Sequence, residues 1–85
     1  MIAEEVRSAL LDIIGEIVPD EDVTNIKGDV PFREQIELDS MDFLDIIMEI
    51  RKRYHLEVPE DNYEELNTLD SSIAYLAPKL AHIRI

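Results

Sequence analysis

Apolar side chains recur at helical spacing in several parts of this 85-residue chain, and no part shows the strict alternation that is typical of a β-strand. The first such part contains Val6, Leu10, Ile13, Ile14 and Ile17. Spacings of three and four residues place these side chains on one face of a helix. We therefore predict an all-α fold that begins with a helix over residues 3–18.

A second helix is predicted over residues 40–54. Asp39 is a good N-cap for it, and Asp42 follows three residues later in an arrangement that resembles a capping box. His55 stands where this helix should close. The start of the second helix is therefore marked more sharply than the start of the first.

Two further helices are predicted in the last third of the chain. Pro59 suits the first turn of a short helix over residues 60–66. Thr68 is a fair N-cap for a last helix over residues 69–77, which Pro78 should end or kink. The expected fold is a small bundle of three main helices plus one short helix.

A long polar segment over residues 19–39 separates the first two helices and contains the helix breakers Gly28 and Pro31. Loops of this length in small domains are usually either functional or disordered. Four apolar residues are spaced so that they can attach the segment to a core: Ile26, Phe32, Ile36 and Leu38. We predict an ordered loop.

Composition limits the partners of the chain. Its 8 Lys and Arg against 20 Asp and Glu give a net charge of −12, which repels nucleic acid and anionic membrane surfaces and favours proteins with basic patches. No apolar run reaches the roughly 18 residues that span a bilayer. The start of the sequence also lacks the positively charged part of a signal peptide. We expect a cytoplasmic protein whose residues 1–85 form a single domain.

Catalysis and metal binding have little support in the sequence. The chain has no Cys, its histidines are His55 and His82, and no Ser/His/Asp arrangement is visible. The segment that starts at Asp20 resembles a calcium-binding loop. However, Asn25 stands where that loop needs glycine, and Pro31 stands where it needs a bidentate glutamate. We expect neither enzymatic activity nor a metal site.

The predicted helix over residues 40–54 carries two apolar stripes, although a bundle helix needs one stripe for its core. The core stripe is Phe43, Ile46, Ile47, Ile50 and Tyr54. The opposite stripe, which we call the docking face, is Met41, Leu44 and Met48, flanked by Asp45 and Glu49. Methionines make adaptable contacts while carboxylates orient a partner. The alternative is a helix that is buried on all sides.

Ser40 lies between Asp39 and Met41 at the start of this helix. A helix N-terminus has unpaired N–H groups and a positive dipole end, so it favours a phosphate ester on this hydroxyl. Nothing nearby could activate the serine, so a modification would have to be made by another protein. The alternative is an ordinary serine in a first helical turn.

The segment LDSMDFLDIIMEI resembles the acyl carrier protein family, in which Asp-Ser-Leu precedes an acidic amphipathic helix. The resemblance extends to the first helix, the loop ending in IELDS, and the segments LEVPEDNYEEL and NTLDSSIAYL. It implies that a phosphopantetheinyl transferase attaches 4′-phosphopantetheine from coenzyme A to Ser40, with Asp39 assisting the Mg²⁺-dependent transfer. The thiol of the arm would then hold acyl groups as thioesters for acyl-transferring or condensing enzymes with basic patches.

Two further groups of residues are expected to take part. The resemblance assigns recognition of the transferase and of partner enzymes to Asp39, Met41, Asp42, Leu44, Asp45, Met48 and Glu49. An acyl pocket inside the bundle would have as walls Phe43, Ile47, Ile50, Ile73 and Leu76. Each of these five is also expected in an ordinary core.

The chain departs from the family pattern in ways that leave its cargo open. Met41 replaces the usual leucine, Glu37 a common glycine and Phe43 a small polar residue, and the basic run 51–53 replaces acidic residues. The basic run indicates a specialised carrier more than the carrier of fatty-acid synthesis. The cargo could be a fatty acyl, polyketide or aminoacyl group, since peptidyl and D-alanyl carriers share the attachment chemistry. An unmodified acidic interaction module is the alternative from another class, and a monomer is expected in each case.

Overall fold

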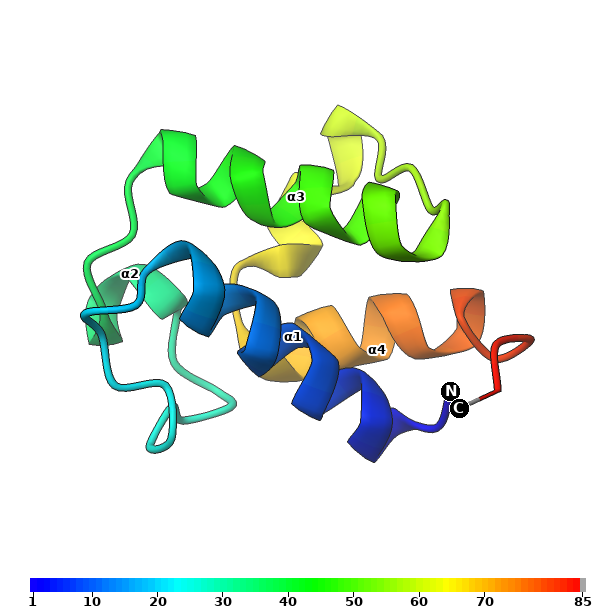
Figure 1. Cartoon of the computed structure of the whole chain (residues 1–85), viewed down its shortest axis with the longest axis horizontal. Helices are drawn as coiled ribbons and strands as arrows, with labels where there is room; N and C mark the ends of the chain where they lie inside the picture. Colours follow the sequence, from blue (N-terminus) through cyan, green and yellow to red (C-terminus); the bar gives the residue numbers. More distant parts are fainter. Residues whose placement is uncertain (85) are drawn as a thin grey trace.

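The computed structural model describes residues 1–84. Its elements are α1 (Ala3–Ile17), α2 (Phe32–Gln35), α3 (Ser40–Tyr54), the 3₁₀ helix η1 (Glu60–Leu66) and α4 (Leu69–Lys79). This part of the chain contains no strand, so the all-α prediction is confirmed. Helix α1 packs against both α3 and α4, and η1 packs against α4 (Figure 1). The N-terminus lies on the side opposite α2 (Figure 1), where the Met1 amino group donates to the carbonyl of Leu80 at 2.8 Å.

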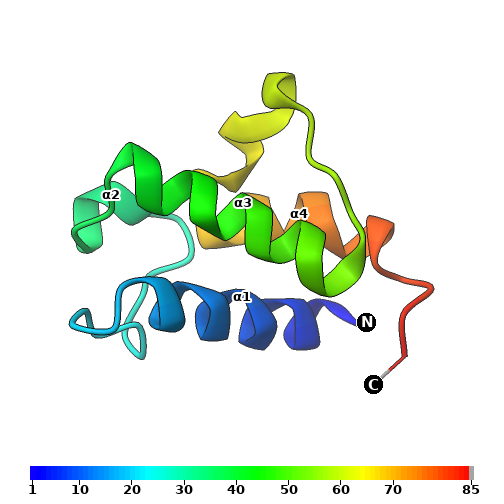
Figure 2. The same ribbon diagram turned by 45° about the horizontal axis from the view of Figure 1, so that its top comes forward.

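The core forms where the apolar faces of α1, α3 and α4 meet (Figure 2). The most deeply buried aliphatic side chains come from all three helices: Ile13, Ile14, Ile50, Leu69 and Leu76. The predicted stripe of α1 is buried except for Ile17, which is half-buried because it lies in the last turn. Within residues 1–84, no helix combines the length and the apolar character that crossing a bilayer requires.

A short helix, α2, interrupts the segment that we expected to be loop throughout. Pro31 precedes it with φ of −54°, which suits the entry to a helix, so this proline starts a helix here instead of breaking one. Phe32 is 4% exposed, and its N–H donates to the carbonyl of Asn67 at 3.0 Å. The buried ring thus anchors this turn in the core, and the hydrogen bond to Asn67 joins it to the connection before α4.

Side-chain and backbone bonds order the rest of the segment. The Gln35 amide oxygen accepts from the N–H of Lys27 at 2.7 Å, and its nitrogen donates to the carbonyl of Lys27 at 2.9 Å. The N–H of Asp70 donates to the carbonyl of Gly28 at 3.0 Å, where these two segments of the chain approach closely. The long loop is therefore held against the start of α4.

The start of α4 is defined by local chemistry, and its end lies beyond a proline. The Thr68 hydroxyl oxygen accepts from the N–H of Ser71 at 3.1 Å, as an N-cap does. The helix runs past the expected end at Ala77 and through Pro78 to Lys79. A proline this close to the end removes one hydrogen bond from the last turn without stopping it.

Arg53 links the last turn of α3 to α1. Its Nε donates to Glu49 Oε2 at 2.8 Å, its Nη1 lies 3.4 Å from Asp12 Oδ2, and its Nη2 pairs with Glu16. The hydrogen bond to Glu49 is the main cause that raises the pKa of Arg53 above its ordinary value. One guanidinium thus contacts three carboxylates and offsets part of their charge in a strongly acidic chain.

We expect Arg53→Met to lower the free energy of unfolding by about 1 kcal/mol, because it removes the ion pairs and leaves three carboxylates to repel one another. Urea unfolding in low salt measures the change, and high salt should reduce it. Arg51→Met is the matched control, since Arg51 is exposed and belongs to none of the ion pairs within residues 1–84. Equal losses in the two variants would contradict the link.

Candidate functional site

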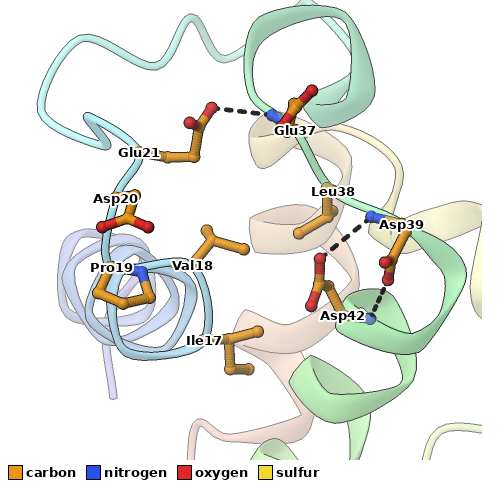
Figure 3. A pocket seen from close by; sticks show the side chains of 9 residues that line it. All are labelled: Ile17, Val18, Pro19, Asp20, Glu21, Glu37, Leu38, Asp39 and Asp42. Carbon is orange, nitrogen blue, oxygen red and sulfur yellow. Dashed lines mark hydrogen bonds between the residues drawn. The ribbon is translucent and has the colours of Figure 1, made fainter.

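The start of α3 is fixed by a reciprocal pair of hydrogen bonds. Asp39 has extended backbone angles, φ −88° and ψ 179°, and its Oδ1 accepts from the N–H of Asp42 at 2.8 Å. Asp42 Oδ2 accepts in turn from the N–H of Asp39 at 3.2 Å (Figure 3). This is a complete capping box, and it makes Ser40 the first helical residue.

Ser40 and the residues on either side of it are exposed. The Asp39 carboxylate satisfies the N–H of Asp42, while other N–H groups of the first turn have no intrahelical partner. An oxyanion esterified to the Ser40 hydroxyl would lie near these donors and near the positive end of the helix dipole. The residues present therefore fit a phosphate ester at this position.

An open hollow of about 540 Å³ lies between the end of α1 and the start of α3. Its walls are Ile17, Val18, Pro19, Asp20, Glu21, Glu37, Leu38, Asp39 and Asp42 (Figure 3). The sequence analysis missed it, because the two segments that line it are distant in the sequence and carry no pattern that shows they meet. The hollow places the end of α1 beside the capping box.

Glu37 and Glu21 join the two ends of the long loop. The Glu21 carboxylate accepts from the N–H of Glu37 at 2.8 Å (Figure 3). Within residues 1–84, positive φ occurs at His55 and not at Glu37, so this position does not need the glycine common in the family. The approach of the chain to Ser40 is therefore set by a side-chain bond instead of by a flexible residue.

The docking face is exposed. Met41 is 71%, Leu44 44% and Met48 64% exposed, and Asp45 is also exposed. The core stripe on the other side of α3 is buried at Ile46, Ile47 and Ile50, and half-buried at Phe43 and Tyr54. The alternative of a helix buried on all sides is therefore excluded.

The two acidic residues of α3 outside its exposed face have partners within the fold. Glu49 is half-buried and accepts from Arg53, and Asp42 takes part in the capping box. Asp45 is exposed, and within residues 1–84 it belongs to no ion pair. Of the three carboxylates, Asp45 is thus the one left to face a partner.

The five residues expected to wall an acyl pocket all belong to or pack against one core cluster. Ile47, Ile50 and Leu76 are buried, and Phe43 and Ile73 are half-buried. Ile50 and Leu76 line a small apolar cavity of about 10 Å³, which the other three residues do not line. That volume is about one water molecule, far less than an acyl chain.

The calcium-like segment has a local explanation. Asp22 Oδ1 accepts from both the N–H and the hydroxyl of Thr24, at 2.9 and 2.5 Å. These bonds lower the pKa of Asp22. In the part of the chain that the structure describes, no group of three or more His, Asp or Glu side chains is arranged to hold a metal ion.

A small all-α domain with an exposed serine at the capped start of an acidic helix has the form of a carrier domain. The family model described as "Phosphopantetheine attachment site" matches residues 4–76. The chain therefore belongs to the acyl carrier protein family, whose members carry a covalent 4′-phosphopantetheine group.

Three bacterial acyl carrier proteins illustrate the similarity. That of Rubrobacter xylanophilus is 30% identical over 73 residues, covering 82% of this chain and 90% of that protein. That of Lactobacillus johnsonii is 29% identical over 76 residues, covering 89% and 94%. That of Brachyspira hyodysenteriae is 28% identical over 72 residues, covering 80% and 92%. The similarity thus extends over nearly the whole length of each relative.

We expect Asp39→Ala to lower the free energy of unfolding by about 1 kcal/mol, because it removes the acceptor for the N–H of Asp42. Asp39→Asn keeps an acceptor oxygen and should cost much less. Urea unfolding followed by circular dichroism measures both changes. If the two variants were equally stable, the capping box would not be what holds the start of α3.

Proposed function

We propose that this chain is a non-catalytic carrier whose Ser40 hydroxyl is the attachment point of the arm. A separate phosphopantetheinyl transferase would join Ser40 Oγ to the phosphopantetheine phosphorus of coenzyme A. The hydroxyl proton leaves with the help of the transferase, and 3′,5′-ADP is the leaving group. The observation that carries the proposal is an exposed serine placed first in a capped helix.

The attached group supplies a thiol that holds an acyl cargo as a thioester. The chain's own residues fix the position of the attachment point. Asp39 and Asp42 fix the direction of α3, and the Glu21 to Glu37 bond fixes the loop that leads to it. A cargo tethered to this rigid point is offered to successive enzymes at a raised effective concentration.

We assign recognition of the transferase and of partner enzymes to the docking face and its neighbours Asp39 and Asp42. Exposed methionines supply adaptable apolar contact, and Asp45 supplies an exposed charge on the same helix as the attachment point. The net charge of −12 adds long-range attraction to basic surfaces. Acyl-transferring and condensing enzymes with such surfaces are the proposed partners of a monomeric, cytoplasmic carrier.

The pathway that fits best is a specialised one of acyl or polyketide assembly. Arg51 and Lys52 are exposed beside Met48 and His55, where they line a common surface hollow. Helical spacing places Lys52 in line with Met48, so the docking face ends in positive charge. A partner with a uniformly basic surface would be repelled there. Peptidyl and D-alanyl carriers remain the alternatives for the cargo.

Intact-mass measurement tests the attachment. We expect incubation with coenzyme A, Mg²⁺ and a broad-specificity phosphopantetheinyl transferase to add the mass of one phosphopantetheine group. Ser40→Ala should abolish the adduct, because it removes the only proposed nucleophile. Ser8→Ala, at another exposed serine of a helix, is the matched control and should leave the adduct unchanged. An unmodified wild-type chain would favour the plain interaction module.

Charge reversal tests the docking face. With a fatty-acid condensing enzyme that has a basic docking surface, we expect Asp45→Lys to lower kcat/KM by about five- to tenfold, because like charges then meet. The double variant Arg51→Glu with Lys52→Glu should instead raise kcat/KM by about threefold, by removing the repulsion. Steady-state kinetics of the acylated carrier gives both values.

Circular dichroism should show unchanged helical content in these variants, since all three positions are exposed. Glu4→Lys, an equal charge change on α1, is the control for net charge alone. If it weakened the reaction as much as Asp45→Lys does, the effect would belong to total charge and not to this face.

A further inference from the structure

Phe43 forms the centre of a contact among three elements. Its ring meets the ring of Tyr63 in η1 edge to face, with centroids 5.9 Å apart and planes at 74°. The guanidinium carbon of Arg33 in α2 lies 5.7 Å from the centroid of the same ring. Both geometries are favourable for an aromatic ring, and both join α3 to elements from outside its own sequence neighbourhood.

The contact lies at the seam between α3 and η1. Within residues 1–84, the closest backbone packing joins α1 to α3, α1 to α4 and η1 to α4, and the side chains of Phe43 and Tyr63 join α3 to η1. In Figure 2, η1 rises away from α3 on the far side from α1.

The neighbours of Tyr63 in η1 attach this helix to α4 and to the core. Asn62 Nδ2 donates to the Tyr75 hydroxyl of α4 at 3.0 Å, and Leu66 at the end of η1 is 2% exposed. The ring that faces Phe43 therefore belongs to an anchored turn. Moving it requires breaking a bond to α4 as well as the aromatic contact.

Phe43 also stands next to the attachment point. It follows Ser40 by three residues, so the two side chains are neighbours on the helix surface. Ile47 follows Phe43 by four residues on the same side and is buried. A chain that leads from Ser40 toward Ile47 along this side of α3 thus meets the Phe43 ring first.

We propose that the pair of Phe43 and Tyr63 closes the seam between α3 and η1, so that cargo stays outside the bundle. Phe43 is then a cover over the core and not a wall of a pocket. An acyl chain left in water gains nothing from its methylene groups, each of which would favour a sheltered state about fourfold if it could be buried. The pair therefore gives long apolar acyl groups no shelter, which favours short or polar acyl groups as cargo. This inference rests on the proposed attachment at Ser40.

Acyl chains of increasing length test the closure. Butanoyl, octanoyl and dodecanoyl groups are loaded on the arm, and hydroxylamine cleavage of each thioester and the melting temperature of each species are measured. For wild type we expect cleavage rates that agree within about twofold and a constant melting temperature. For Phe43→Ala we expect octanoyl and dodecanoyl thioesters to be cleaved more slowly than butanoyl by about fourfold or more, since burial of one methylene already gives that factor. Their melting temperatures should be higher by about 4 °C or more.

Variants of Tyr63 separate the closure from a general loss of packing. Tyr63→Ala removes the other half of the pair and should behave as Phe43→Ala does. It can replace Phe43→Ala as the test variant if that variant fails to fold. Tyr63→Phe keeps the ring and should behave as wild type. Dependence on chain length in wild type, or its absence in both alanine variants, would overturn the closure alone. Failure to form the Ser40 adduct at all would overturn the proposed function with it.

Discussion

The reciprocal bonds between Asp39 and Asp42 determine where α3 begins, and the rest of the site follows from that position. Because helical side chains rotate by a fixed angle per residue, a fixed first residue also fixes which residues face the core and which face solvent. Ser40 is then first and exposed, Met41 opens the docking face, and Phe43 turns toward η1. A start displaced by one residue would leave these side chains without the orientation that their roles require.

The two ends of α3 are stabilised by different interactions, and together these interactions hold the helix in place. At the first turn two carboxylates satisfy backbone N–H groups, while at the last turn Arg53 joins α3 to two carboxylates of α1. The helix is therefore held at both ends, and its exposed face does not need to contribute to folding. That face is free to be apolar and charged for the benefit of a partner, which a small domain allows only when its core is secured elsewhere.

Much of this arrangement is encoded locally and could be predicted from particular residues. The two stripes of α3 follow from spacing, and its start follows from Asp39 and Asp42. The helix that follows Pro31 was missed, because Pro31 was read as a breaker and a helix of four residues is too short to show a repeating apolar spacing. The end of α4 was misplaced for a similar reason, since packing of Leu80, 2% exposed, carries the helix past Pro78. Roles such as that of Glu49 also depend on Arg53, whose partners in α1 lie far away in the sequence.

By itself the sequence determined the helical fold, the boundaries of α3 and the identity of the serine at its start, because these depend on interactions between residues a few positions apart. Only the tertiary structure decided how the elements meet. It joined the ends of the long loop through Glu21 and Glu37, paired Arg53 with α1, and brought Tyr63 and Arg33 onto the ring of Phe43. Such contacts depend on distances set by the packing of the whole core, and no local pattern of residues contains them.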